Sequence, residues 1–255
     1  QHRLKMNCRF PHANSTRRLF CFPWAGGGAS YYTAWGKHIS DDIEVIGVCL
    51  PGRETRYQEP CCSDAKQIID WIVKTIHDEY FDKPFAFFGH SMGALLSFLV
   101  ALELKQLYNR EPDHMFLSGT TALHSPLREA RILNVSQMSK SEFIEKLKIL
   151  GGTPPEFFDN PELMDIFYPS LYADFCMVPQ FKYDHKADQP PPLTCPIDFF
   201  DGKDDVGHDI EAWKQVTSGT FRFEHMPGGH FFLKDPENMK KLWTFIDLRY
   251  SQYML

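Results

Sequence analysis

The segment FFGHSMGALLSF, residues 87–98, constrains the fold more than any other part of the chain. It places Ser91 between Gly89 and Gly93, directly after the apolar run 85–88 and directly before an apolar helical pattern. A strand that passes into a helix with almost no loop forces unusual backbone angles at the turn, and neighbouring segments can approach only where side chains are missing. In this context the pattern G-x-S-x-G raises a serine hydroxyl above the end of a sheet. The alternative is a glycine-rich turn in which the serine only caps a helix.

Short apolar runs alternate with helical patterns along most of the chain. Expected strands cover residues 18–22, 44–50, 85–88, 115–118, 196–200 and 220–225. Expected helices cover residues 30–39, 64–80, 94–107 and 234–250. This alternation predicts an α/β fold with a mostly parallel sheet and helices on both faces. The length of 255 residues fits one domain, 1–255.

Residues 123–188 interrupt this alternation, because they carry helical patterns only, such as SKSEFIEKLKIL and NPELMDIFYPSLYADF. We call this segment the helical insertion and expect it to form a lid over the carboxyl edge of the sheet, where parallel sheets place their sites. The alternative is ordinary covering helices. If the segment is a lid, some of its apolar residues should line a channel; the candidates are Phe143, Leu147, Phe157, Phe158, Met164 and Phe167.

A serine becomes a strong nucleophile only when a base removes its proton, and an acid must orient that base. His230 is the candidate base, because it lies in the glycine-flanked loop MPGGHFF after the last expected strand. The chain has 11 histidines, so position matters more than presence. We expect His90, His208 and His225 to be structural or solvated, with His225 inside a strand and His208 at the start of a helix.

The acid should follow the preceding strand, in IDFFDGKDD. Asp201 directly follows the expected strand and is assigned to the turn, whereas Asp209 is assigned to the next helix. The choice between Asp204 and Asp205 is close, and we prefer Asp205.

A tetrahedral intermediate needs two N–H donors for its oxyanion. The residue after the serine, Met92, supplies one. The loop FPWAGGG after the first expected strand supplies the other, and Ala25 is the candidate. A glycine-rich turn without a ligand is the alternative. The loop is not a phosphate cradle, because it matches neither G-x-x-x-x-G-K-[ST] nor a dinucleotide fingerprint.

Composition excludes several classes of protein. The net charge is −6 and no basic cluster is present, so we expect no nucleic-acid partner. The seven cysteines are scattered without C-x-x-C, which argues against a disulfide framework or a metal site and favours a reducing compartment. No apolar run reaches the roughly 18 residues that span a bilayer, and residues 1–18 lack the apolar core of a signal peptide. We therefore expect a cytoplasmic protein with no membrane association.

Six segments together resemble the type II thioesterases: FPWAGGGASYYTAW, LPGRETR, FFGHSMGALLSF, LGGTPPEFFDNPELM, YPSLYADF and MPGGHFF. These enzymes are stand-alone α/β-hydrolases that serve fatty acid synthases, polyketide synthases and nonribosomal peptide synthetases. The match runs in order over most of the chain, from about residue 18 to residue 235.

The resemblance implies an α/β-hydrolase fold with Ser91 as nucleophile, His230 as base and Asp205 as the orienting acid. It implies Ala25 and Met92 as oxyanion donors. The implied reaction is hydrolysis of acyl thioesters on the phosphopantetheine arm of an acyl or peptidyl carrier protein, without a metal or cofactor of the enzyme's own. Editing of misprimed acyl groups and release of a product chain are both open. A carboxylesterase or lipase acting on oxygen esters is the alternative enzyme, although such enzymes usually carry an HGGG-type loop.

A carrier protein would have to bind to a particular part of this protein's surface. Carrier proteins are generally acidic, and this chain is acidic too, so attraction needs a local basic patch. Arg128 and Arg131 in LREAR are the candidate docking residues, with Arg53 in GRETR as a weaker one. The alternative for Arg53 is that it holds a loop by pairing with Glu54 or Glu59. We expect the enzyme to be a monomer.

Overall fold

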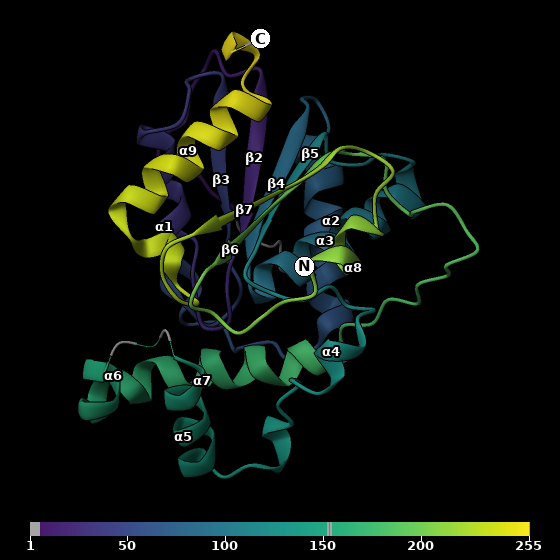
Figure 1. Ribbon diagram of the computed structural model, residues 1–255. Coiled ribbons are helices and arrows are strands. Elements are labelled where there is room, and N and C mark those ends of the chain that lie inside the picture. The colour runs from purple at the N-terminus through teal and green to yellow at the C-terminus, as the bar shows by residue number, and fades with distance from the viewer. Residues whose placement is uncertain (1–5, 152, 154, 255) are drawn as a thin grey trace.

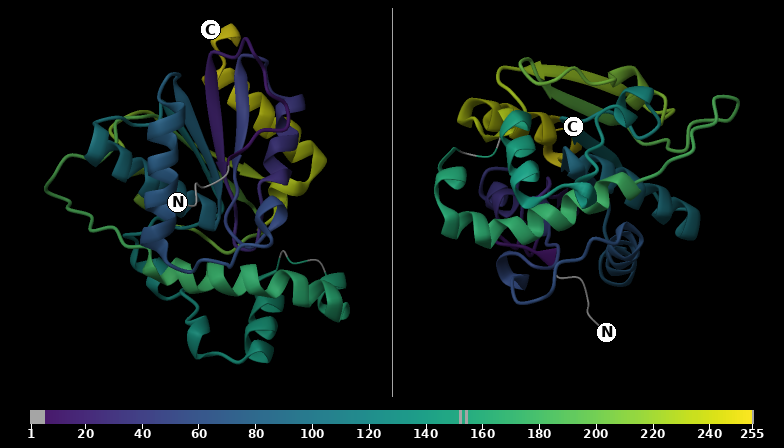
Figure 2. Two further views of the ribbon diagram at one scale, coloured as in Figure 1. Left: turned by 180° about the vertical axis from the view of Figure 1, so that it is seen from behind. Right: turned by 90° about the horizontal axis from the view of Figure 1, so that it is seen from below.

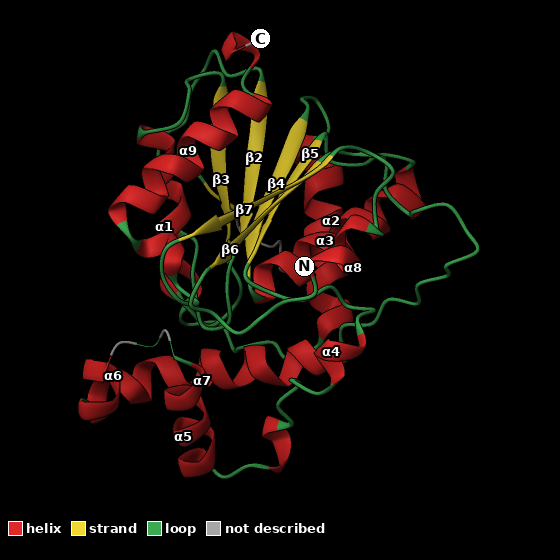
Figure 3. Ribbon diagram, viewed as in Figure 1, coloured by secondary structure: helices red, strands yellow, loops and turns green. Residues whose placement is uncertain are grey.

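The structure, a computed structural model, describes residues 6–151, 153 and 155–254. Its centre is a seven-stranded sheet in the order β1-β3-β2-β4-β5-β6-β7 (Figures 1 and 3). β1 pairs antiparallel with β3, and the other neighbouring pairs are parallel. The α/β fold predicted from the alternation is therefore confirmed. The strands are β1 Met6–Asn7, β2 Arg17–Phe22, β3 Ile43–Val48, β4 Phe85–His90, β5 His114–Ser118, β6 Ile197–Gly202 and β7 Phe221–Met226.

Helices cover both faces of this sheet (Figure 2). α2, α3 and α8 pack on one face, and α1 and α9 pack on the other. Because both faces of the central strands are buried, these strands read as continuous apolar runs rather than as alternating ones. In β2, for example, Phe20 faces one layer and Leu19 the other, and both are fully buried. The helices outside the insertion are α1 Ser30–Thr33, α2 Ala65–Tyr80, α3 Met92–Tyr108, α8 Ile210–Lys214 and α9 Pro236–Tyr250.

Local sequence signals explain where the longer helices begin and end. The Asp64 side chain accepts the N–H of Gln67 at the start of α2, and Asp235 caps α9, whose first residue is Pro236. Asn109 ends α3 in the left-handed conformation. Two expectations need correction. Residues 30–39 form α1 followed by a 3-10 turn rather than one helix, and β1 was not predicted because two residues carry no periodic pattern.

The helical insertion lies between β5 and β6, and its described residues form helices and turns but no strand. Its longest helix, α7, runs across the carboxyl ends of the strands, below the sheet in Figure 1. A small core of its own holds it together, made of Val135, Phe143 and Leu147 with aromatic side chains around them. None of the described helices is long and apolar enough to cross a membrane. The helices of the insertion are α4 Pro126–Glu129, α5 Lys140–Leu150, α6 Pro155–Asp159 and α7 Pro161–Met177.

Candidate active site

Ser91 occupies a strained turn between β4 and α3. Its backbone angles are φ 57° and ψ −120°, which side-chain-bearing residues rarely adopt. A Cβ at Gly89 would lie 2.3 Å from the Gly93 carbonyl oxygen, and a Cβ at Gly93 would lie 2.3 Å from the Phe22 carbonyl oxygen. Both contacts are with backbone, so no side chain fits at either position. The expected turn is therefore present, and it projects Ser91 from the carboxyl end of β4.

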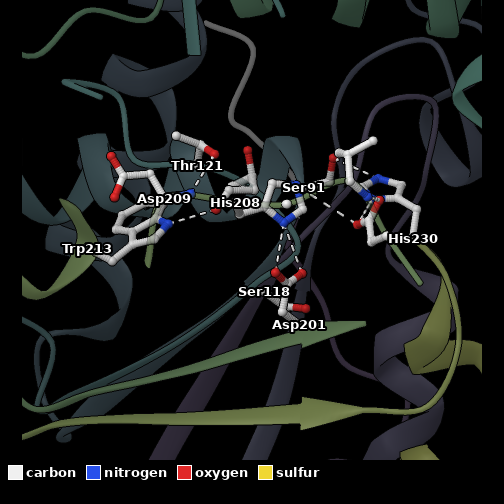
Figure 4. A network of polar contacts seen from close by, with 12 residues as sticks. Ser91, Ser118, Thr121, Asp201, His208, Asp209, Trp213 and His230 are labelled. Atoms are coloured by element: carbon white, nitrogen blue, oxygen red, sulfur yellow. Dashed lines mark hydrogen bonds and ion pairs between the residues drawn. The ribbon is translucent and has the colours of Figure 1, made fainter. Parts of the chain in front are cut away.

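The structure brings Ser91, His230 and Asp205 together. His230 Nε2 lies 3.2 Å from Ser91 Oγ, and its Nδ1 lies 2.8 Å from Asp205 Oδ2. Figure 4 shows Ser91 and His230 facing each other across this contact. Asp205 comes from the loop after β6 and His230 from the loop after β7, as the order of the strands predicts. Asp204, the competing acid, is exposed, whereas the Asp205 side chain is 6% exposed.

The environment of Asp205 favours its ionised form. Burial raises the pKa of this carboxyl. The hydrogen bond from His230 and the charges of His230 and His208 lower it by more, so the net pKa is below the usual value. The second oxygen, Oδ1, accepts the backbone N–H of Val206 at 2.8 Å. The ionised Asp205 carboxylate is therefore held in place and can accept a hydrogen bond from a protonated Nδ1 of His230.

The position of His208 differs from the expectation. It does not start a helix, because α8 begins two residues later with Asp209 as its cap. Instead His208 lies beside the site, with Nδ1 2.9 Å from Asp201 and Nε2 4.0 Å from Asp205 (Figure 4). Asp201 is the penultimate residue of β6 rather than a turn residue. The expectation that His208 is structural or solvated omitted its contact with this site.

Asp201, Asp205 and His208 place ligand-type atoms within 4.8 Å of one another, the spacing of a metal site. The hydrogen bonds already described account for these groups, since Asp201 accepts from His208 and Asp205 accepts from His230. The cluster is therefore explained as paired acids and imidazoles.

His90 and His225 take the structural and solvated roles expected of them. His225 is an exposed residue of β7. His90 is fully buried, and its Nδ1 lies 2.8 Å from Ser118 Oγ. Burial, followed by the charge of His230, lowers the pKa of His90 well below its usual value. His90 is therefore neutral at neutral pH. Its ring lies 4.9 Å from that of His230.

The two residues expected to bind the oxyanion, Met92 and Ala25, come from the start of α3 and from the loop after β2. Met92 is the first residue of α3, so its N–H has no partner within the helix. Residues 24–27 form a tight turn in which the Gly27 N–H donates to the Trp24 carbonyl at 2.8 Å. Gly26 has φ +77°, which the third position of a type II turn requires. Ala25 precedes Gly26 and lines the same cavity as Ser91.

A cavity of about 350 Å³ connects this site to the helical insertion. Ser91 and His230 lie in its wall, and apolar side chains of the insertion form much of the rest. Among the six channel residues expected from the sequence, Leu147 lines the cavity, whereas Phe143 is buried in the core of the insertion and Phe157 packs on Phe167. The apolar lining residues that the sequence analysis missed include Leu133, Leu171 and Phe175.

The arginine expectations need correction. Arg128 is only 8% exposed, its Nη2 donates to the Val178 carbonyl at 2.8 Å, and burial lowers its pKa. Arg128 is therefore not an exposed charge, whereas Arg131 is exposed and donates to the Gly207 carbonyl. Arg53 pairs with Asp174 of α7, a residue that is distant in sequence. Of the two expected partners, Glu54 accepts the hydroxyl of Ser30 and Glu59 pairs with Arg56.

The family profile described as "Thioesterase domain" matches residues 17–249. The human medium-chain S-acyl fatty acid synthase thioesterase is 39% identical over 240 residues, which cover 94% of this chain and 89% of that protein. The gramicidin S biosynthesis protein GrsT of Aneurinibacillus migulanus is 39% identical over 219 residues, with coverages of 85% and 82%.

Solved structures agree with these relatives. RedJ, the thioesterase from the prodiginine biosynthetic pathway of Streptomyces coelicolor, superposes with a TM-score of 0.80 at 29% identity, covering 92% of this chain and 91% of RedJ. The fold and the matches define an α/β-hydrolase thioesterase. The chain belongs to the thioesterase family and is a thioester hydrolase. The resemblance to type II thioesterases is thereby confirmed, and nothing supports the oxygen-ester alternative.

Proposed function

We propose that Ser91, His230 and Asp205 carry out the hydrolysis, and that the substrate is an acyl group on the phosphopantetheine arm of a carrier protein. The observation that supports the catalytic roles is the continuous contact from Asp205 Oδ2 to His230 Nδ1 and from His230 Nε2 to Ser91 Oγ, at 2.8 and 3.2 Å. Both contacts are within the hydrogen-bond reach that a nucleophile, its base and the acid that orients the base require. Relatives named for fatty acid, gramicidin and prodiginine synthesis support the carrier-bound substrate.

The chemistry follows from the positions of these groups. Ser91 Oγ attacks the carbonyl carbon of the thioester while His230 Nε2 takes the hydroxyl proton. The negative charge on the carbonyl oxygen is met by the N–H groups of Ala25 and Met92. The C–S bond then breaks, and the leaving thiolate receives the proton from His230. Asp205 stays ionised and stabilises the imidazolium that forms between these steps.

A second round of the same proton transfers releases the product. Water loses a proton to His230 as its oxygen attacks the acyl-serine ester. The ester bond breaks, Ser91 Oγ regains a proton from His230, and the free acid leaves. The apolar wall formed by the helical insertion, with Leu147 and Phe175 among its residues, is suited to the acyl chain. No metal or cofactor of the enzyme takes part in this scheme.

Two measurements test the proposal. Ser91→Ala should remove nearly all turnover while the protein stays folded, because loss of a triad member leaves only about 10³–10⁴-fold catalysis over water. An active-site serine probe should label the wild type and not this variant. Near wild-type turnover in the variant would end the assignment of Ser91.

The substrate class is tested with a panel of acyl-carrier thioesters from acetyl to dodecanoyl, beside matching free pantetheine thioesters and oxygen esters. The proposal expects the carrier-bound thioesters to have the highest kcat/KM. Equal values with and without the carrier would contradict the carrier-bound substrate. The position of the maximum along the panel separates editing of short groups from release of longer chains.

A further inference from the structure

Helix α7 of the helical insertion touches the turn that presents the Ala25 N–H. The Gly26 N–H donates to Asp174 Oδ2 at 2.7 Å. A Cβ at Gly26 would lie 2.4 Å from Leu171 Cδ2, so helix and turn are in close contact there. Leu171 and Asp174 are three residues apart and share a face of the helix. One face of α7 therefore both packs on the turn and hydrogen-bonds to it.

Arg53 holds the Asp174 carboxylate in place. Its guanidinium binds both carboxylate oxygens, with Nη2 to Oδ1 at 2.8 Å and Nη1 to Oδ2. The two side chains are 6% and 0% exposed. Nη1 also donates to the Gly27 carbonyl at 3.2 Å, so the pair contacts the turn twice. A bidentate pair of this kind fixes the orientation of both groups, and here it joins the loops after β2 and β3 to α7.

Stability alone does not account for this arrangement. A buried ion pair often contributes no more stability than apolar residues of similar size. The acceptor for the Gly26 N–H does something that apolar residues cannot. A flip of the Ala25–Gly26 peptide would turn the Ala25 carbonyl towards the Asp174 carboxylate, which repels the partial negative charge of the carbonyl oxygen. The carboxylate therefore holds the turn in a single conformation.

We infer that Asp174 is a positioning residue through which the helical insertion fixes the turn that presents the Ala25 N–H to the oxyanion. This inference rests on the proposed function, in which Ala25 is one of the two donors. A displacement of about 1 Å at such a group can cost about 10²-fold in rate. Asp174 thus supports the chemistry from a helix that takes no direct part in it.

Two double variants isolate the hydrogen bond to Gly26. Arg53→Met with Asp174→Asn removes the buried charges and keeps an oxygen acceptor for the Gly26 N–H. Arg53→Met with Asp174→Leu removes the charges and the acceptor together, with a side chain of similar size. Asp165→Asn is the control on the same helix, since Asp165 is exposed and pairs with Lys140 of the insertion at 3.0 Å.

With a pantetheine thioester, we expect the Leu double variant to have a kcat about 10–100-fold below that of the Asn double variant. The KM values should agree within about threefold, because the ground state does not use the oxyanion contact. The affinity for an acyl trifluoromethyl ketone, whose adduct carries an oxyanion, should fall with kcat, whereas that for a non-hydrolysable thioether analogue should not. Equal kcat in the two double variants, or equal loss of affinity for both inhibitors, would overturn the inference.

A measurement on the wild type covers the case in which a variant does not fold. Hydrogen exchange at the Gly26 amide should already be slow in the free enzyme, and exchange at the rate of an unstructured peptide would overturn the inference. Failure of the proposed function looks different. It would appear as a wild type that binds the trifluoromethyl ketone no more tightly than the thioether, or as an active Ser91→Ala variant.

Discussion

Replacing Asp205 with asparagine should leave the protein folded and nearly inactive, for a reason that follows from its two hydrogen bonds. Oδ2 faces His230 Nδ1 at 2.8 Å, and Oδ1 accepts the Val206 N–H at 2.8 Å. An asparagine has one oxygen for these two donors. If the oxygen stays with Val206, the NH₂ group faces Nδ1, which must then accept. The proton of His230 is forced onto Nε2, and the ring can no longer take the proton of Ser91.

The opposite orientation of the amide is also unfavourable, because it sets the NH₂ group against the Val206 N–H. Neither orientation restores the negative charge that stabilises the imidazolium. Loss of the orienting carboxylate with retained geometry lowers kcat by about 10⁴ in a serine triad. Since each tenfold change is 1.36 kcal/mol of barrier, a loss of about 10³–10⁴ in kcat corresponds to about 4–5.5 kcal/mol.

The assay is steady-state hydrolysis of a pantetheine thioester between pH 6 and 9, with thermal unfolding as the control for folding. The activity of Asp205→Asn should stay low across this range, because the amide does not titrate. Asp204→Asn is the matched variant, since Asp204 is the exposed neighbouring acid, and it should retain activity within a few-fold. If Asp205→Asn kept more than about a tenth of the wild-type kcat, or if Asp204→Asn were the more damaged, the assignment of the acid and the tautomer argument would both be wrong.

Three further predictions concern the cavity, the surface and stability. Leu147→Trp places a larger side chain in the cavity wall and should shift the best substrate to shorter acyl chains, since each buried methylene contributes about 0.8 kcal/mol. Phe167→Trp should leave the preferred chain length unchanged. Identical length profiles for the two variants would show that Leu147 does not contact the acyl chain. Arg131→Glu should raise KM for an acyl-carrier thioester and leave KM for a pantetheine thioester unchanged. In the wild type, KM for the acyl-carrier thioester should rise with salt concentration. If both substrates respond alike, Arg131 does not take part in docking. Asp42→Asn should lower the free energy of unfolding by about 1–3 kcal/mol at pH 7. Burial raises the pKa of the Asp42 carboxyl, but its hydrogen bonds and the nearby Arg17 lower it more, so the net pKa is below the usual value. The stabilisation by Asp42 is therefore present above the unfolded-state pKa and is lost as pH falls through the folded-state pKa. A difference in stability from the wild type that persists in strong acid would contradict this.

Features set by local sterics could be predicted from the sequence. The turn at Ser91 follows from Gly89 and Gly93, since a Cβ at either would collide with backbone. The loop position of His230 follows from the order of the strands. The choice of Asp205 over Asp204 was weaker, because adjacent carboxylates on one loop differ only in which way the backbone turns them.

Features that depend on contacts between distant segments could not be predicted. Arg53 and Asp174 are separated by 121 residues, and nearer glutamates were the obvious partners. The lining of the cavity was largely missed, because apolar residues occupy most faces of α7 and their pattern does not distinguish Phe175 from Phe167. His208 was misplaced because α8 begins later than its sequence suggests.

The distance along the chain between the two reacting side chains has a consequence for biosynthesis. Ser91 and His230 are separated by 139 residues, and the loop that carries His230 follows the last strand of the sheet. A nascent chain therefore exposes its serine long before any base can reach it, and remains inert towards thioesters until β7 has added to the sheet. In a refolding experiment, the return of turnover consequently requires the docking of this final strand.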